Sequence, residues 1–329
     1  MILRRTIPPL LAFVAVCFCV GKAKAQDPQF TQFYANKLYL NPAFAGSYKC
    51  PRAIISYRDQ WPGLTGQGST LFRTISASYD QHFDEMSGGL GLLVTQDDAA
   101  STLSTTRVSG IYSYQLKIDR KFNIRAGFQA TWFQRKLDWS KLTFGDMIDP
   151  RKGFIYNTQN KQEGGSVSGV DFSAGVIGNS EKYFFGAAVH HMTEPDESLL
   201  PSTEESPLPM KITGHAGANI PLVDSRFSDD AMTLSPNILF QQQGNFQQLN
   251  LGAYLQKGPI VGGLWYRNRD AFIALIGFQK GIFKFGYSYD VTISSLSSHT
   301  QGAHELSLTL NFDCPPEKKD FRTISCPSF

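Results

Sequence analysis

Apolar and polar residues alternate along most of the chain after residue 51. Between residues 122 and 132 the even positions are apolar or small, and the odd positions are mostly polar or glycine. The segments 107–118, 283–291 and 305–312 repeat this pattern. Successive side chains of a β-strand point to opposite faces, so a period of two predicts strands with one apolar and one polar face.

About fourteen segments carry this pattern, and no convincing helical period interrupts them. Strands in soluble sheets are typically about five or six residues long. A tilted strand needs about 9–11 residues to cross a bilayer, and many of these segments are that long. The pattern therefore predicts membrane-spanning strands at residues 52–61, 70–82, 88–98, 104–118, 121–136, 168–178, 182–192, 209–219, 232–243, 246–257, 259–268, 271–280, 282–292 and 303–313.

The connections between these segments differ in length as they do in outer-membrane barrels, which have short periplasmic turns and longer outer loops. With the first strand running outward, the longest connections, 137–167 and 193–208, fall on the outer side. Most connections on the other side are tight, although 220–231 is an exception. We therefore predict an all-β fold, a transmembrane antiparallel β-barrel of about 14 strands at residues 52–313, located in the cell outer membrane.

A secreted β-sandwich or a soluble barrel would also alternate, but its apolar face would point inward. Here charged and amide side chains stand in the middle of the polar faces, which suits a wet or hydrogen-bonded lumen. Aromatic residues gather near strand ends, where membrane barrels have interfacial girdles; Trp132 and Trp265 are two of them. The apolar face is therefore predicted to contact outer-membrane lipid, and the 13% aromatic content to lie largely on that wall.

The two ends of the chain lie outside the predicted barrel. Residues 1–25 read as a secretory signal peptide, with a basic start, a short apolar stretch and a small-x-small cleavage site. Residues 26–51 are then a periplasmic N-terminal segment, and residues 314–329 a periplasmic C-terminal tail. Without Arg4, Arg5, Lys22 and Lys24, the 31 basic residues become 27 against 28 acidic ones, which changes the net charge from +3 to −1. Such a chain has no basic field for nucleic acid.

The sequence offers little catalytic or metal-binding chemistry. It contains no G-x-S-x-G, H-E-x-x-H, C-x-x-C or phosphate-loop motif. His304 and Glu305 are adjacent on a predicted strand, so their side chains point to opposite faces and cannot converge on one substrate. A polar network of one of them with Asp290 or Arg267 is the preferred interpretation. His190 and His191 are expected to split across the two faces in the same way. We therefore expect no enzyme activity, no catalytic residue, no cofactor and no metal.

Three stretches resemble one family, the PorP/SprF membrane proteins of the type IX secretion system. The first is Gln26 to Phe33, with its Q-x-P-x-F opening, followed by the N-P-A-F-A-G box at 41–46. The second is Y-R-D-Q-W at 57–61 on the first predicted strand. The third comprises boxes in the last strands, L-W-Y-R at 264–267, G-Y-S-Y-D at 286–290 and A-H-E-L-S-L at 303–308. Order and spacing agree over almost the whole mature chain, but the cysteine-containing tail after Phe312 is not a recognised family feature.

This resemblance implies an outer-membrane component of the type IX secretion and gliding apparatus. Its expected partners are periplasmic secretion-system proteins, either scaffold or peptidoglycan-binding, and a secreted adhesin or other cargo at the outer loops. The protein would link the periplasmic machinery to secretion or surface attachment of that cargo. The alternative function is a passive porin or a hydrophobic-solute transporter of similar strand number.

The residues before the first strand allow two interpretations. Proline fixes its own φ angle and asparagine favours local turns, so the N-P-A box is expected to form a rigid bend. In one interpretation the segment folds into the barrel mouth as a plug or seam. In the other it is a docking surface for a periplasmic partner, with Gln32, Asn41, Pro42 and Gly46 as candidate contacts.

Three cysteines remain after the signal peptide. Cys50 precedes the first strand and Cys314 follows the last, and those strands are neighbours in a closed barrel. Both residues would lie at the periplasmic rim, in an oxidising compartment, which makes Cys50–Cys314 a candidate disulfide. The alternatives are a Cys314–Cys326 pair within the tail, or three free thiols.

Overall fold

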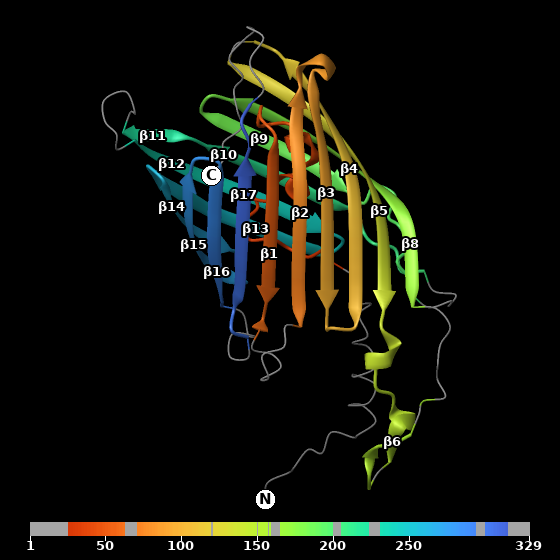
Figure 1. Cartoon of the computed structure of the whole chain (residues 1–329). Helices are drawn as coiled ribbons and strands as arrows, with labels where there is room; N and C mark the ends of the chain where they lie inside the picture. The colour runs from red at the N-terminus through yellow and green to blue at the C-terminus, as the bar shows by residue number, and fades with distance from the viewer. Residues whose placement is uncertain are drawn as a thin grey trace, which may run out of the picture.

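The alternating segments form the strands of one antiparallel sheet that closes on itself (Figure 1). The computed structural model describes residues 26–62, 71–119, 121–149, 151–156, 158, 165–199, 205–223, 231–293 and 300–314. The expected signal peptide and residues 315–329 of the expected tail, with Cys326, lie outside the described residues.

The wall is a closed barrel of 14 strands, so the predicted fold is confirmed. The short strand β11 continues β10, because both pair with β12. A register shift between Pro221 and Val223 marks this junction. The wall strands are β1 (Arg52–Gln60), β2 (Phe72–Phe83), β3 (Gly88–Ala99), β4 (Leu103–Lys117), β5 (Phe122–Leu137), β8 (Ser166–Ser180), β9 (Tyr183–His190), β10 (Lys211–Ala218), β11 (Ile220–Val223), β12 (Met232–Gln243), β13 (Phe246–Lys257), β14 (Ile260–Arg267), β15 (Ala271–Lys280), β16 (Phe283–Thr292) and β17 (Ala303–Asn311).

Closure brings the first and last strands together. Strand β1 pairs with β17 in register from Arg52 opposite Asn311 to Gln60 opposite Ala303. Every other wall pairing joins strands that are consecutive around the ring and antiparallel, as hairpin connections require. Residues far apart in sequence therefore share one short arc of the lumen.

The two faces of the wall have opposite chemistry. Large apolar side chains cover the outside, and Leu264 and Ile276 are 72% and 60% exposed. Many inward positions carry polar side chains, of which Ser113 and Asn250 are fully buried, and a smaller set of inward apolar side chains, such as Ile177, packs with the N-terminal segment. This is the arrangement of a barrel in lipid, which must satisfy its polar groups internally. Within the described residues, no helix is long and apolar enough to cross a membrane.

The two rims of the barrel differ in the length of their connections. The long connections 138–165 and 191–210 lie on one side, which we call the outer rim, and short turns dominate the other, the periplasmic rim. The first outer connection carries the helical turns η4 (Trp139–Lys141) and η5 (Gly145–Met147) and a small hairpin of β6 (Ile148–Asp149) and β7 (Gly153–Phe154). The turn η3 (Asp84–Met86) lies at the periplasmic rim.

The prediction that Trp265 belongs to the aromatic girdle is wrong. Trp265 is 3% exposed and points into the lumen, where its ring centroid lies 5.0 Å from that of Phe33. The face on which a residue lies is set by alternation along β14, where Val261, Trp265 and Arg267 are buried on one face and Leu264 is exposed on the other. The position of Trp265 near a strand end does not determine its face.

Candidate functional site

The N-terminal segment, residues 26–50, lies inside the barrel, and we call it the plug (red in Figure 1). Residues 30–47 are buried except for Tyr39, which is half-buried. The segment begins near the outer rim and leaves at the periplasmic rim, where Cys50 leads into β1. The segment expected in the periplasm therefore occupies the lumen.

A compact bend gives the plug its shape. It contains a four-residue helix, α2 (Lys37–Leu40), and a helical turn, η1 (Pro42–Phe44). The Asn41 side chain caps this turn by accepting a hydrogen bond from the Ala43 backbone N–H at 2.9 Å. Its amide nitrogen also donates to the backbone oxygens of Val176 and Ala187 in the wall, at 3.2 and 3.1 Å. The same asparagine thus bends the plug and fixes the bend to the wall.

Glu305 anchors the outer half of the plug. Its carboxylate accepts hydrogen bonds from the backbone N–H groups of Thr31 at 2.6 Å and Gln32 at 3.0 Å. The neighbouring His304 points to the outer face, where it lies 2.9 Å from the hydroxyl of Tyr287. The predicted split of this His–Glu pair across the wall therefore matches the structure.

A buried cluster of four charges surrounds this anchor. Arg58 contacts Asp290 at 3.0 Å and Glu305 at 3.2 Å, and Arg267 contacts Asp290 at 3.1 Å. Both guanidinium groups also donate to the Thr31 hydroxyl, which in turn donates to Asp290 at 2.7 Å. The side chains come from β1, β14, β16 and β17, so the plug is bonded across the seam of the barrel.

Asp27 forms a second anchor close to the outer rim. His191 lies 2.7 Å from Asp27 on one ring nitrogen and 2.7 Å from Asp171 on the other. Burial disfavours the charged imidazole, but the two carboxylates outweigh it and raise the pKa of His191 to about 9. Burial likewise opposes ionisation of Asp27, yet His191, Lys211 and Arg107 hold its pKa well below the usual range.

The expected split of His190 and His191 across the two faces is wrong. Both side chains are buried, and His190 lies 3.3 Å from the backbone oxygen of Leu40. Strand β9 ends at His190, and His191 adopts a φ of +57°, which turns its ring back into the lumen. The left-handed backbone interrupts the strand alternation on which the expectation depended.

Arg107 connects the plug to an outer loop. Its guanidinium lies 3.6 Å from Asp27 and 3.0 Å from Glu197 in the connection 191–210. Arg135 binds the other oxygen of the Glu197 carboxylate at 2.6 Å. The outer loop is therefore fastened to the wall at the point where the wall holds the plug.

The periplasmic end of the plug is held by Asp80. Its carboxylate accepts from the Gly46 backbone N–H and from the Arg52 guanidinium, each at 2.9 Å. Arg125 donates to the backbone oxygen of Gly46 at 2.9 Å. A charged pair at the start of the wall thus fixes the exit of the segment.

A disulfide joins Cys50 to Cys314, whose Cα atoms are 4.5 Å apart and 264 positions apart in sequence. It connects the end of the plug with the residue that follows the last strand. The bond therefore closes the seam between β1 and β17 at the periplasmic rim.

The candidate partner contacts lie in the interior. Gln32 and Asn41 are fully buried, and Pro42 and Gly46 are also buried. All four contact the wall or the rest of the plug, and these contacts agree with the interpretation of this segment as a plug.

The sequence predicts a polar network of His304 or Glu305 with Asp290 or Arg267, and the structure shows one in which Arg58 joins Glu305 to Asp290, but the sequence does not identify this network as the binding site of the plug. The signal of the residues that bind the plug is charge in the middle of a strand on the inward face, as at Arg58 and Arg125.

Across the described ranges, no three His, Cys, Asp or Glu side chains gather to hold a metal ion.

The fold and this interior define a class, an outer-membrane β-barrel whose lumen is occupied by its own N-terminal segment. The chain belongs to the PorP/SprF family, the type IX secretion system membrane proteins, and matches it over residues 22–310. The resemblance in the sequence is thereby confirmed. The protein is located in the outer membrane, and its membership implies that it works with other components of that secretion system.

Solved outer-membrane proteins share low sequence identity with this chain. Omp33 of Acinetobacter baumannii is 8% identical, with 81% of this chain and 100% of Omp33 covered and a TM-score of 0.42. The CymD monoaromatic hydrocarbon channel is 12% identical, with 84% and 93% covered and a TM-score of 0.44. A TodX deletion mutant, also a monoaromatic hydrocarbon channel, is 11% identical, with 84% and 94% covered and a TM-score of 0.46. No curated protein matches the chain.

Proposed function

We propose that this protein is a sealed scaffold in the outer membrane, linking periplasmic secretion machinery to the secretion or surface attachment of adhesin-like cargo. The observation that carries the proposal is the plug, buried from residue 30 to residue 47 and bonded to the wall near both rims. A passive porin needs a continuous aqueous path, and this segment occupies it. Cargo would then contact the surface of the barrel instead of passing through it.

The two rims support different contacts. On the outer side, the β6–β7 hairpin extends beyond the wall (Figure 1), and this hairpin and the connection 191–210 would meet cargo. On the other side, short turns form the surface that periplasmic proteins would meet. The contact of Arg107 with both Asp27 and Glu197 joins the outer loop to the plug.

The buried position of Asn41 and its neighbours bears on how partners dock. A periplasmic protein would reach Gln32, Asn41, Pro42 or Gly46 only if the plug left the lumen, which would break the charged anchors at Glu305 and Asp80. We therefore propose that these four residues hold the plug, and that periplasmic partners bind the turns of the rim.

Single-channel conductance tests the seal. The purified protein in a planar bilayer should show no large steady pore, and a variant lacking residues 26–46 should conduct ions. Both proteins must migrate as folded barrels in an unheated gel. A large steady conductance of the wild type would support the porin alternative and contradict the proposal.

The scaffold function needs a second measurement. Affinity purification from the native envelope, followed by mass spectrometry, should recover periplasmic secretion components with the wild-type protein. Recovery of lipid alone, together with a sealed lumen, would contradict the link to the machinery.

A further inference from the structure

Strand β8 extends further than its neighbour β9 on the outer side of the wall. It pairs with β5 along its whole length, as far as Lys136 opposite Ser166 at the outer rim. Its pairing with β9 starts only at Ala174, opposite Val189. Residues 166–170 of β8 therefore have a paired strand on one side only, and we call this stretch the free edge.

Hydrogen bonds at the two ends of the free edge show which backbone groups it presents. The Gly165 oxygen accepts from the Leu137 N–H of the β5 side at 2.6 Å, and the Phe172 oxygen accepts from the Met192 N–H of the β9 side at 3.0 Å. Backbone groups of an antiparallel strand point alternately to its two sides. The residues that direct N–H and C=O away from β5 are therefore Ser166, Ser168 and Val170. Within the described part of the chain, no backbone group pairs with them from that side.

The outer loop that follows β9 does not pair with the free edge. It contacts β8 at the two ends of this stretch, through Thr193 and Leu199. Between these contacts Glu197 reaches inward to Arg107. The described part of the loop is thus directed over the lumen and leaves the backbone groups of the edge unpaired.

The free edge begins at the outer boundary of the membrane. Val170 lies opposite Trp132, whose side chain is 44% exposed on the lipid-facing wall, as expected of the aromatic girdle. Further outward, β5 carries the polar residues Gln134 and Lys136. The edge therefore continues into water, where another polypeptide can reach it.

The free edge has none of the features that usually prevent strand pairing. Natural sheets protect an edge with proline, lysine or a bulge. The free edge has the sequence S-V-S-G-V, without charge or proline, and its register with β5 is continuous. Its serine and glycine side chains are small, so a second strand can approach the backbone closely.

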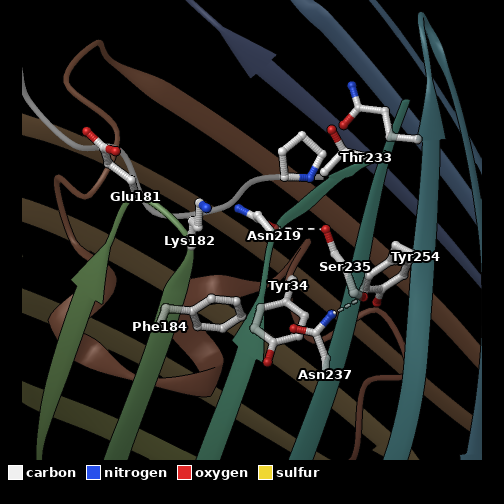
Figure 2. Close-up of a pocket in the computed structure, with 11 residues that line it drawn as sticks. Tyr34, Glu181, Lys182, Phe184, Asn219, Thr233, Ser235, Asn237 and Tyr254 are labelled. Carbon is white, nitrogen blue, oxygen red and sulfur yellow. Dashed lines mark hydrogen bonds between the residues drawn. The ribbon is translucent and has the colours of Figure 1, made fainter. Parts of the chain in front are cut away.

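The edge of β11 at the periplasmic rim has such protection. Figure 2 shows Asn219 beside Lys182, and the Asn219 N–H donates to the Lys182 backbone oxygen at 2.7 Å. Beyond this point β11 pairs with β12 alone. It contains Pro221, which has no N–H to donate, and a register shift follows. The barrel thus protects its periplasmic edge and leaves its outer edge unprotected.

We propose that the free edge of β8 binds an extended segment of the secreted cargo by strand addition. Donors and acceptors that alternate along a strand edge match the backbone of another extended chain, a repeat that a sugar or a lipid headgroup does not offer. The edge lies at the outer rim, where cargo would meet the barrel. The inference rests on the proposed scaffold function for the identity of the polypeptide, whereas strand addition follows from the edge itself.

Fluorescence polarisation with a synthetic strand tests the edge. The probe is a short labelled peptide of alternating threonine and valine between terminal lysines, added to the intact protein in detergent. It should bind saturably, with a Kd of about 1 mM or tighter. The same peptide with prolines at its centre should not bind, because proline has no N–H.

Matched variants locate the binding on β8. Ser168→Pro removes an N–H that faces away from β5, so the bonds to β5 remain while the edge is blocked. It should weaken the Kd by about tenfold or more. Gln134→Ala is the control, because it lies opposite Ser168 on β5 and should leave the Kd unchanged. Ser166→Pro, at the first position of the strand, replaces Ser168→Pro if the latter fails to fold.

Surface retention in native cells tests the identity of the polypeptide. Mass spectrometry of the cell surface and the medium should show at least one secreted protein that Ser168→Pro releases and Gln134→Ala retains. The absence of such a release would overturn the assignment to cargo. A wild-type dimer that Ser168→Pro separates would also overturn it, because a second copy would then occupy the edge.

Strand addition itself is overturned by three results in the peptide assay. These are no saturable binding to the folded wild type, equal binding by the wild type and the folded proline variants, and equal binding of the peptide that contains proline. None of them alters the seal or the recovery of periplasmic components, so the scaffold function stands or falls separately.

Discussion

Arg58 and Arg267 place two guanidinium groups against Asp290 and Glu305 in the interior, all 4% exposed or less. Moving such charges out of water costs several kcal/mol each, and close ion pairing with additional hydrogen bonds offsets that cost. Thr31 supplies such bonds, since it donates to both carboxylates and accepts from both arginines. The four charged groups therefore lose these hydrogen bonds if the plug leaves the lumen.

Arg58→Met should destabilise the protein strongly. The change leaves Asp290 and Glu305 short of a buried countercharge, which typically costs about 3–5 kcal/mol. The urea midpoint of unfolding, followed by gel migration, measures the effect. Arg73→Met is the matched control, because Arg73 pairs with Asp98 near the outer rim and is 42% exposed. Its loss should cost about 1 kcal/mol or less. Equal losses in the two variants would contradict the buried cluster as a source of stability.

His191 should make stability depend on alkaline pH. Its pKa is raised to about 9 in the folded protein, from an ordinary value near 6.5. The stabilisation by Asp27 and Asp171 is thus fully present below about pH 6.5 and is lost as the pH rises through about 9. Urea midpoints of the wild type should fall across this window, and those of His191→Gln should fall less. Parallel curves for the wild type and His191→Gln would refute this assignment.

The plug and the wall approach each other at the level of their backbones. A Cβ atom at Gly127 would lie 2.3 Å from the Ala43 backbone nitrogen, and one at Gly89 would lie 2.4 Å from the Ala45 backbone oxygen. Gly46 in the plug has a φ of +60°, which a residue with a side chain rarely adopts. Small residues on both elements therefore allow the plug to lie flush against β3 and β5.

Gly127→Ala should loosen the plug while the barrel stays intact. The new methyl group overlaps the plug backbone, which cannot move aside without breaking the bonds of Asn41 to the wall. We expect ion conductance through the variant in planar bilayers. Gly110→Ala is its control, because Gly110 lies on the outer face of β4 with nothing within 4 Å of a new Cβ atom. A sealed Gly127→Ala barrel would show that this contact does not position the plug.

The strands could be predicted because their cause is local. The period of two follows from strand geometry and from the contact of the wall with lipid on one face and with a polar interior on the other. The strand at 122–132 can therefore be predicted from its own residues. The sequence allows a plug in the barrel mouth as one of two interpretations of the N-terminal segment, but it does not give the path of the segment through the lumen, because its contacts join residues far apart, such as Thr31 and Glu305, which are 274 positions apart. His191 escaped prediction for a related reason, since its left-handed φ depends on the loop that follows it.

At the scale of the whole molecule, the barrel is held closed at one seam. Strands β1 and β17 pair along their length, and the disulfide of Cys50 with Cys314 lies just beyond the end of that pairing. The charged cluster of Arg58 and Glu305 crosses the same seam from inside. Pairing, ion contacts and a covalent bond therefore all join the two ends of the wall.

Removal of the disulfide should weaken this closure. The bond links residues 264 positions apart, and the loss of a native disulfide typically costs about 2–5 kcal/mol. The double variant Cys50→Ser, Cys314→Ser should therefore show a lower urea midpoint than the wild type. Peptide mapping without reduction should recover Cys50 joined to Cys314. Alkylation of Cys50 before any reduction would contradict the bond.

The direction of the plug determines how the molecule can be built. The chain runs through the lumen from Gln26 near the outer rim to Cys50 at the periplasmic rim, so this segment must lie inside the ring by the time the pairing of β1 with β17 closes it. Strand β17 is the last to be synthesised, and only its pairing with β1 encloses the segment. A folded domain fused ahead of Gln26 is too wide for the ring and would have to enter through the open seam.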